Sequence, residues 1–243
     1  MIARREATTS IDDARGRLVI VFDPERLPQA DADLFDPGAY RPAAEPVASG
    51  GRGGAWYVDT AAGPAVLRHF RRGGLVARLS EDGYLWRGLD AARSVREFRL
   101  LQWMHGRGLP VPVPLAAAVR RRGLVYRADL LVGRIVGART LAALVGEGVA
   151  PLPWVSIGRA IGRIHRAGVD HADLNAHNIL IDAAGAAWVI DFDRGRRRPP
   201  GGWAEGNLLR LQRSLRRVAG DDTAVGVGFA GLREGWLSVM EER

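Results

Sequence analysis

The stretch HADLNAHNIL, residues 171–180, gathers side chains that can carry out acid–base and metal chemistry. His171, Asp173, Asn175 and Asn178 fall within eight positions, and an apolar run follows directly. An aspartate in such a loop can accept the proton of a substrate hydroxyl. A polar turn capped by Asp and Asn side chains has a similar composition, so the spacing must separate the two interpretations.

A further carboxylate, Asp191, follows Asn178 by thirteen residues. Between them lie two short apolar runs, Ile179–Ile181 and Ala187–Ile190, separated by the turn residues Asp182–Gly185. This pattern predicts a hairpin, and a tight hairpin brings its outer ends together. We therefore expect Asn178 and Asp191 to converge on a hard-oxygen site suited to Mg²⁺ that carries a nucleotide triphosphate.

The composition is that of an ordinary globular chain with a strong positive charge. The 243 residues are 47% hydrophobic and 26% charged, with a net charge of +8 and a pI near 11.0. This charge favours an anionic partner: a nucleotide, a nucleic acid or an acidic membrane surface. There is no cysteine, no apolar run long enough to span a bilayer and no signal-peptide pattern, so we expect a cytoplasmic protein. All 35 basic residues are arginine. Compositional drift can explain this, but every phosphate contact must then come from a guanidinium or a backbone amide.

The first part of the chain has the signals of a strand-rich domain that contains one helix. Alternating apolar residues and turn signals predict a strand near the N-terminus and two hairpins, and helical spacing predicts the helix. In chain order these elements are the strand Arg17–Phe22, the hairpin strands Ala55–Val58 and Ala65–Phe70, the helix Ser94–Met104, and the hairpin strands Leu115–Val119 and Leu124–Val136.

The second part of the chain changes to helices, and its only expected strands bracket the polar cluster. Helical spacing predicts a helix over Trp154–Ala167 that ends at Gly168. A shorter helix begins with Thr140–Val145, and the last strong helix covers Leu208–Val218.

The pattern H-x-D-L-x-x-x-N over 171–178, followed by D-F-D at 191–193, resembles the catalytic loop and metal-binding segment of the protein-kinase-like fold. The resemblance implies that Asp173 orients an acceptor hydroxyl and takes its proton late in the transfer. It also implies that Asn178 and Asp191 hold Mg²⁺ on the phosphates of ATP.

Three other polar residues of the loop receive different expectations from this resemblance. His171 is expected to support the backbone of the catalytic loop. Asn175 stands where protein kinases often carry a lysine, and its amide supplies a hydrogen bond but no charge. His177 is left without a role.

The resemblance also implies an α+β fold with two lobes and ATP in the cleft between them. We expect an N-terminal extension over residues 1–48, a small antiparallel β-rich N-lobe with one helix over 49–136, and a mostly helical C-lobe over 137–243.

The expected N-lobe offers candidates for nucleotide binding. A glycine loop that covers phosphates with backbone amides would stand ahead of the first hairpin, although a linker has the same composition. Its residues are Gly50, Gly51, Arg52, Gly53 and Gly54. Arg68 replaces the usual lysine of the third strand and can hold the α- and β-phosphates bidentately. Glu97 is its expected partner; alternatively, Ser94 and Glu97 form a capping box at the start of the helix.

The absence of a long activation segment after the D-F-D motif argues against a protein kinase and for a small-molecule phosphotransferase. The wider sequence is similar to the 3-deoxy-D-manno-octulosonic acid (Kdo) kinase family from about Gly50 to Arg217. The similar segments are LRHFRRGGL, YLWRG, RSVREFRLL, GLPVPVP, YRADLL, HADLNAHNIL and IDFDRG. Arginine at position 68 is normal for that family.

This resemblance implies ATP-dependent phosphorylation of the 4-hydroxyl of Kdo on a lipid A precursor, in the synthesis of the lipopolysaccharide core. It also implies a peripheral protein on the cytoplasmic face of the inner membrane, with ATP, Mg²⁺, the lipid A precursor and an anionic membrane surface as partners. Nucleic acid is not expected.

Several arginines are candidates for the anionic acceptor, because guanidinium groups bind carboxylates and phosphates well. Arg71 and Arg72 lie near the glycine loop in the expected fold. Arg210, Arg213 and Arg217 share the face of the last predicted helix opposite its apolar face. Such a stripe either docks anionic headgroups or is a solvated surface, and the spacing does not decide between the two.

Two other functions remain open at this point. One is another sugar kinase, such as a heptose kinase of the lipopolysaccharide core, or a small-molecule kinase. The other is a basic binding protein without catalysis that uses a kinase shell, for instance on nucleic acid. A degenerate shell usually loses one of Asp173, Asn178 and Asp191, and all three are present, which favours an enzyme.

Overall fold

The computed structural model describes residues 6–47, 54–71, 83–220 and 222–242. Positions 50–53 of the predicted glycine loop and Arg72 lie outside these residues. The described residues form a mixed α/β fold with antiparallel sheets and five α-helices. The chain divides into two compact units, Met1–Trp103 with Val113–Arg134 and Met104–Pro112 with Ile135–Arg243.

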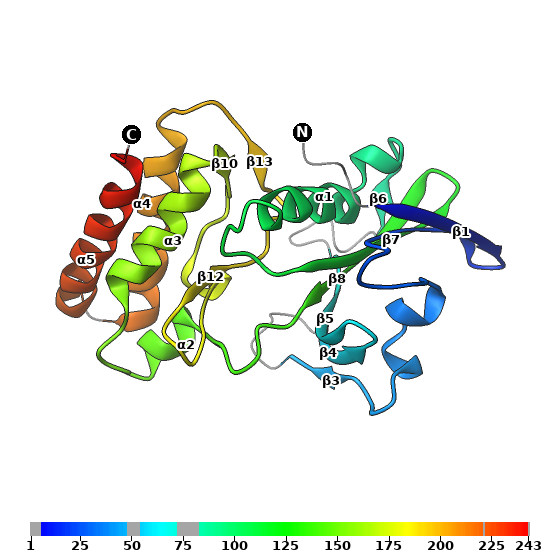
Figure 1. Ribbon diagram of the computed structural model, residues 1–243, viewed down its shortest axis with the longest axis horizontal. Helices are drawn as coiled ribbons and strands as arrows, with labels where there is room; N and C mark the ends of the chain where they lie inside the picture. The colour runs from blue at the N-terminus through cyan, green and yellow to red at the C-terminus, as the bar shows by residue number, and fades with distance from the viewer. Residues whose placement is uncertain (1–5, 48–53, 72–82, 221, 243) are drawn as a thin grey trace. The chain divides into compact units, whose positions relative to one another are not determined.

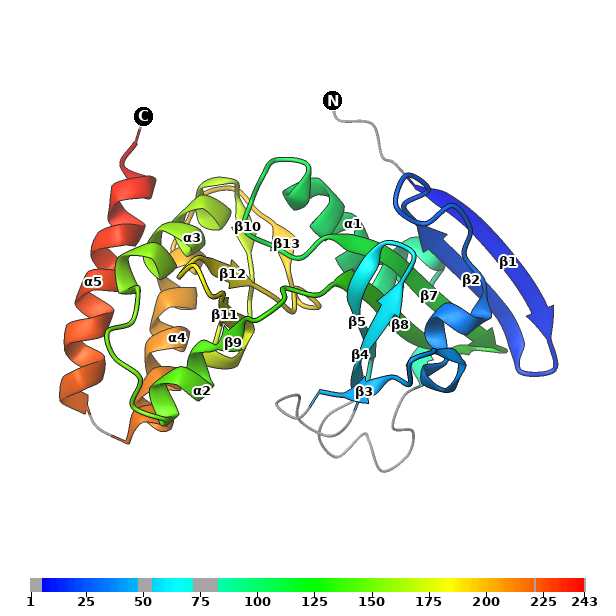
Figure 2. The same cartoon turned by 60° about the horizontal axis from the view of Figure 1, so that its bottom comes forward.

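The first unit is built on one antiparallel sheet. Its strands are β1 (Ala7–Asp13), β2 (Gly16–Phe22), β3 (Glu45–Pro46), β4 (Ala55–Thr60), β5 (Gly63–His69), β6 (Tyr84–Leu85), β7 (Pro114–Arg122) and β8 (Val125–Gly133). The strands lie in the order β1-β2-β7-β8-β5-β4-β3, and β6 pairs with β8 (Figure 1 and Figure 2). The two predicted hairpins are therefore present as β4–β5 and β7–β8. The predicted strand Leu124–Val136 was too long, because β8 ends at Gly133 and the chain then turns at Gly137, whose φ is 71°.

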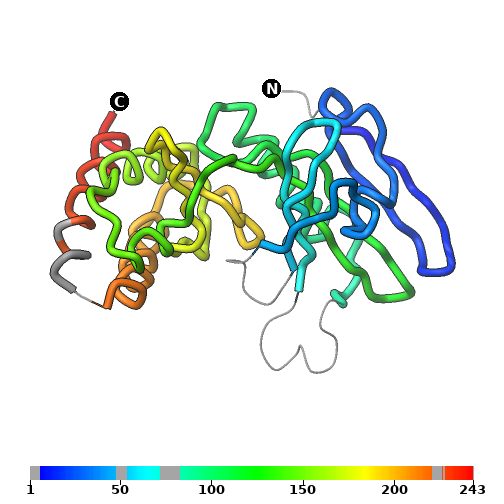
Figure 3. Tube along the Cα trace, turned by 90° about the horizontal axis from the view of Figure 1, so that it is seen from below, coloured from blue at the N-terminus to red at the C-terminus, as the bar shows by residue number. Residues whose placement is uncertain are grey.

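The N-terminal residues contribute to this sheet. The predicted strand Arg17–Phe22 lies within β2, which pairs with β7 over Arg17–Phe22, and β1 forms the sheet edge beside it (Figure 3). The side chains of Leu18, Ile20 and Phe22 are buried in one core with residues of β5, β7 and β8. The strand β1 was not predicted, since ATTSIDD has only one large apolar side chain and is half-buried at an edge.

The helix α1 (Arg93–His105) packs against the sheet and includes the predicted span Ser94–Met104. Val95, Phe98 and Leu101 on its apolar face are buried. Ser94 lies inside the helix, and its Oγ donates to the carbonyl of Ala118 on β7 at 2.9 Å. Because Ala92 and not Ser94 occupies the N-cap position, and the Glu97 carboxylate accepts from Arg68, the capping-box alternative does not hold.

The second unit is mostly helical. Its helices are α2 (Leu141–Gly146), α3 (Trp154–Arg166), α4 (Trp203–Ala219) and α5 (Asp222–Met240), and its short strands are β9 (Arg139–Thr140), β10 (Val169–Asp170), β11 (Ile179–Ile181), β12 (Ala187–Val189) and β13 (Arg196–Arg197). The strands form two small antiparallel sheets, β12-β11-β9 and β10-β13 (Figure 2). The predicted hairpin over 179–190 is thus present as β11–β12.

The last predicted helix, Leu208–Val218, was not the last one: it is part of α4, and α5 follows. The sequence of α5 contains glycines that lower helix propensity, but these glycines let α5 pack closely beside α3 (Figure 1). A Cβ on Gly235 would lie 2.1 Å from the carbonyl oxygen of Val155, and a Cβ on Gly158 of α3 would lie 1.9 Å from that of Leu232. The close backbone approach stabilises a helix that propensity alone does not predict.

Within the part of the chain that the structure describes, every helix is too short or too polar to cross a bilayer.

Candidate active site

The hairpin β11–β12 brings the two predicted metal ligands to the same end. Ile179 pairs with Val189 in the antiparallel register, so Asn178 and Ile190 are the next residues outward. The amide of Ile190 donates to the carbonyl of Asn178 at 3.0 Å. Asp191 follows Ile190 directly and is exposed, while Asn178 is buried. The hairpin therefore places the backbones of Asn178 and Asp191 at the same end, as the spacing predicted.

His171 connects the loop to the strand that leads to Asp191. Its Nε2 donates to the carbonyl of Ile190 at 2.9 Å, and its Nδ1 accepts the amide N–H of Asp173 at 3.3 Å. The ring of Phe192 packs on the imidazole, with 4.6 Å between the ring centroids. Burial lowers the pKa of His171 below its ordinary value, so the ring is neutral and can both donate and accept. The histidine thus fixes the backbone on both sides of the site.

Two asparagines fix the backbone of Asp173 and leave its side chain available. The carbonyl of Asp173 accepts from Nδ2 of Asn175 at 2.9 Å and from Nδ2 of Asn178 at 3.2 Å. Asn175 also accepts the amide N–H of His177 through Oδ1 at 2.9 Å, so both its polar atoms are used inside the loop. The carboxylate of Asp173 is 46% exposed. The loop therefore presents this carboxylate to an incoming group, and Asn175 is a capping residue within it.

The backbone is strained at two positions of the site. Ala172 has a φ of 60° and Asp191 a φ of 65°, and they are the non-glycine residues with positive φ among those described. This conformation is unfavourable for side chains other than glycine and clusters at functional sites. Ala172 directly precedes Asp173, and Asp191 is one of the two predicted metal ligands, so the strained backbone lies at both carboxylates of the site.

Asp170 is a residue of the site that the sequence analysis missed. Its carboxylate is 4% exposed, and Oδ1 accepts from the amide of Ala172 at 3.0 Å and from Nδ2 of Asn207 at 2.9 Å. Oδ2 accepts from Nε of Arg196 at 3.3 Å and from Nη1 of Arg198 at 3.1 Å. Asp170 therefore joins the catalytic loop, α4 and the segment after the D-F-D motif. Its position next to His171 was the only local signal, because its side-chain partners lie 26 to 37 residues away.

Helix α4 contacts the loop through one face. Ser214 Oγ accepts the amide of Ala176 at 3.1 Å, and Nη1 of Arg210 lies 3.8 Å from Oδ1 of Asp173. Arg210 thus lies beside Asp173, the candidate catalytic residue. Arg213 and Arg217 are exposed on the same helix.

The first unit holds the predicted arginine–glutamate pair. Arg68 on β5 donates to Glu97 on α1, whose side chain is buried. The guanidinium also stacks on the ring of Phe70, 4.5 Å from its centroid. Gly54, the one described residue of the predicted glycine loop, accepts the amide of His69 at 2.7 Å. Arg71 lies beside Gly54, since a Cβ there would be 3.6 Å from Nε of Arg71.

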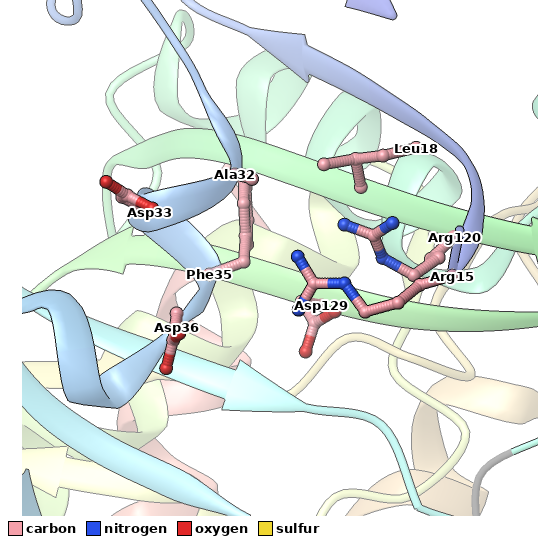
Figure 4. A pocket seen from close by; sticks show the side chains of 8 residues that line it. All are labelled: Arg15, Leu18, Ala32, Asp33, Phe35, Asp36, Arg120 and Asp129. Atoms are coloured by element: carbon pink, nitrogen blue, oxygen red, sulfur yellow. The ribbon is translucent and has the colours of Figure 1, made fainter. Parts of the chain in front are cut away.

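A pocket of about 250 Å³ lies on one face of this sheet (Figure 4). Its lining includes three aspartates and two arginines: Arg15, Leu18, Ala32, Asp33, Phe35, Asp36, Arg120 and Asp129. Arg68 points to the other face, since successive side chains of a strand point to opposite faces and Nδ1 of its neighbour His69 contacts the pocket residue Asp129 at 2.6 Å. The carboxylates offset the arginines, so this pocket does not suit a triphosphate.

The donor set at the hairpin fits a magnesium–nucleotide complex. Mg²⁺ is usually bound by one or two carboxylates together with substrate phosphates and water, and seldom by a cage of protein ligands alone. Asp191 supplies one carboxylate, and Asn178 supplies an amide oxygen. In the described chain, at the hairpin or elsewhere, there is no group of three or more His, Asp and Glu residues that would hold a metal ion without a substrate.

The fold and the site define a phosphotransferase of the kinase type: a carboxylate on a braced loop, two oxygen donors at one hairpin end, and an arginine–glutamate pair on a strand and a helix. Residues 41–226 match the family described as the lipopolysaccharide kinase (Kdo/WaaP) family. The chain belongs to this family.

Curated relatives are similar along most of their length. The 3-deoxy-D-manno-octulosonic acid kinase of Stenotrophomonas maltophilia (strain R551-3) is 54% identical over 220 residues, which cover 89% of this chain and 87% of the relative. The kinase of the same name from Xanthomonas campestris pv. campestris (strain B100) is 54% identical over 222 residues, 90% of this chain and 88% of the relative. That of Stenotrophomonas maltophilia (strain K279a) is 51% identical over 237 residues, 95% and 94% of the two chains.

Proposed function

We propose that this protein transfers the γ-phosphoryl group of ATP to the 4-hydroxyl of a Kdo residue on a lipid A precursor. The observation that carries the proposal is the exposed carboxylate of Asp173 on a loop that His171 and two asparagines hold rigid. The names of the relatives, at 54% identity over about nine tenths of the chain, support the acceptor.

In the proposed reaction, Asp173 accepts a hydrogen bond from the acceptor hydroxyl and takes its proton late. The bond between the γ-phosphorus and the bridging oxygen to the β-phosphate breaks, and a new bond forms between the phosphorus and the sugar oxygen. ADP leaves with the bridging oxygen. A loose transition state needs little base strength, so positioning of the hydroxyl matters more than the basicity of Asp173.

The other predicted site residues have proposed roles in nucleotide binding. Asn178 and Asp191 would hold Mg²⁺, which supplies charge neutralisation on the phosphates when bound. We assign the α- and β-phosphates to Arg68, which Glu97 orients, and to the loop Gly50–Gly54. In this proposal the two compact units correspond to the N-lobe and C-lobe of a kinase-like fold.

The acceptor also bears on where the protein works. A lipid A precursor is held in a membrane, so the proposed enzyme is a peripheral protein on the cytoplasmic face of the inner membrane. The net charge of +8 supports contact with an anionic surface. Arg71, Arg72 and Arg213 remain candidates for the anionic groups of the acceptor.

The test is a transfer assay with radiolabelled ATP and Mg²⁺ on a lipid A precursor that carries one Kdo residue. We expect label on the 4-hydroxyl of Kdo with the wild-type protein and none with Asp173→Ala. The exposed Arg159→Gln, on α3, serves as a control that should retain transfer. Label that appears only on a heptose-bearing core would move the acceptor, and ATP binding without transfer to either acceptor would refute the enzymatic proposal.

A further inference from the structure

Three residues on one face of α4 contact the catalytic loop and the residue that precedes it. Asn207, Arg210 and Ser214 are spaced by three and four residues, so they lie on the same side of the helix. Asn207 contacts Asp170, Arg210 contacts Asp173, and Ser214 contacts the amide of Ala176. The three contacts are therefore in register with the loop.

The contacts of Asn207 and Ser214, which lie on either side of Arg210, fix the position of the Arg210 backbone. Asn207 and Ser214 are both buried, and so are Leu208, Leu211 and Leu215 on the adjoining face of the helix. The guanidinium itself is 47% exposed. An anchored helix thus carries a solvent-accessible cation that lies 3.8 Å from the catalytic carboxylate.

The charge balance of the loop explains what this cation could do. A transferring phosphoryl group carries negative charge on its three equatorial oxygens, and it must come close to the carboxylate of Asp173. Asn175 brings no charge, and both its polar atoms already bond within the loop. A guanidinium at the position of Arg210 offsets the repulsion and can offer two parallel N–H groups to phosphoryl oxygens.

We propose that Arg210 is a catalytic residue that binds the phosphoryl group in transit from ATP to the acceptor. This assignment rests on the proposed phosphotransferase function and differs from the membrane or acceptor contact expected from the helical stripe. In the resting protein Arg210 pairs with Asp173. When the acceptor hydroxyl bonds to Asp173, the guanidinium turns its N–H groups to the phosphoryl oxygens.

The test compares Arg210→Gln and Arg210→Lys with Arg216→Gln, an exposed arginine on the same helix. We expect Arg210→Gln to lower kcat about 100-fold or more, with the KM values for ATP and acceptor within about 3-fold of wild type. Arg210→Lys should recover part of the rate, because it restores the charge without the planar fork. Arg216→Gln should match the wild type.

A second readout does not depend on the acceptor. Binding of ADP with Mg²⁺ is measured by calorimetry with and without aluminium fluoride, which mimics the planar phosphoryl group. Aluminium fluoride should tighten the binding of ADP to the wild type and to Arg216→Gln, but not to Arg210→Gln. ADP alone should bind all of them equally.

Three outcomes would overturn the assignment. A defect confined to the KM of the acceptor would show that Arg210 reads the sugar acid, and unchanged kinetics would reduce the pair with Asp173 to a surface contact. A fluoride effect that persists in Arg210→Gln also contradicts it. A wrong acceptor gives a different pattern: the wild type then fails to phosphorylate Kdo while the fluoride complex still forms and still requires Arg210.

Discussion

Replacement of Asp170 by asparagine removes one buried negative charge and changes the shape of the side chain little. The carboxylate accepts four hydrogen bonds, from the amide of Ala172, from Asn207, and from the guanidinium groups of Arg196 and Arg198. We expect Asp170→Asn to destabilise the second unit and to slow phosphoryl transfer, because Ala172 directly precedes the catalytic aspartate.

The magnitude follows from which bonds the amide can keep. Its oxygen can face Ala172 and Asn207, but its NH₂ group then points at two guanidinium donors. A hydrogen bond to a charged group contributes about 1.5–3 kcal/mol. Arg196 and Arg198 are 58% and 41% exposed, so water replaces part of what they lose. We expect a total loss of about 2–3 kcal/mol in the free energy of unfolding, or roughly 5–10 °C in Tm.

The pH dependence has a definite sign. Burial raises the pKa of Asp170, but the bonds from Asn207, Arg198, Ala172 and Arg196 outweigh it, so the folded-state pKa lies below the ordinary 3.8. A depressed carboxyl pKa stabilises the folded protein above the unfolded value, and this stability is lost as the pH falls through the folded value. The stability difference between wild type and Asp170→Asn should therefore be full at pH 7 and should shrink below about pH 4.

The assay combines thermal unfolding followed by circular dichroism with the rate of phosphate transfer. Asp182→Asn is a matched control, because Asp182 also accepts two backbone amides and a side-chain N–H, in the exposed β11–β12 turn. We expect kcat about 10-fold lower for Asp170→Asn and unchanged for the control. Equal Tm and equal kcat for Asp170→Asn and the wild type would refute the reasoning.

Three further predictions concern the two units separately. Glu97→Gln removes the countercharge of Arg68, so kcat/KM for ATP should fall about 10- to 100-fold. The exposed Arg96→Gln on the same helix should change kcat/KM by less than about 2-fold. Equal values for the two variants would contradict the role of the pair. Burial lowers the pKa of His165 to about 4, so the folded state resists protonation and the wild type loses stability as the pH falls from 6.5 toward 4. Urea denaturation at pH 7 and pH 4.5 measures this loss. Between the two pH values the free energy of unfolding should fall by about 2 kcal/mol less in His165→Gln than in the wild type, and equal falls would contradict the lowered pKa of His165. Gly158→Ala places a Cβ against a carbonyl of α5 and should lower the free energy of unfolding by about 3 kcal/mol or more. At Gly206 a Cβ meets nothing within 4 Å, so Gly206→Ala should raise it by about 0.5–1 kcal/mol through helix propensity. Tm values of the opposite order would overturn the packing argument.

The sequence indicated much of the local structure and the residues of the loop. The hairpin around the turn after Ile181 followed from apolar runs and turn residues, which act within a few positions along the chain. The approach of Asn178 to Asp191 then followed from the geometry of any tight hairpin. The pairing of Arg68 with Glu97 was favoured by the resemblance to the kinase-like fold, and the position of Ser94 inside the helix excluded the capping box.

Elements with weak local signals required the tertiary structure. The half-buried edge strand β1 and the glycine-containing helix α5 have patterns that local propensity does not favour. The sheet stabilises β1 by pairing it with β2, and the backbone contact of Gly158 and Gly235 with the facing helix stabilises α5. The partner of α5 is far from it along the chain, and β1 is held by its pairing with β2, which its own apolar pattern does not indicate.

For the site itself, the sequence alone determined that Asp173, Asn178 and Asp191 occur at a spacing suited to phosphoryl transfer. Only the tertiary structure placed Asp170 among its four donors and Arg210 beside Asp173. Helical periodicity assigns a residue to one face of its own helix, but it does not state what that face meets. The contact between α4 and the catalytic loop joins residues 37 and 38 positions apart, and packing of the whole unit decides it.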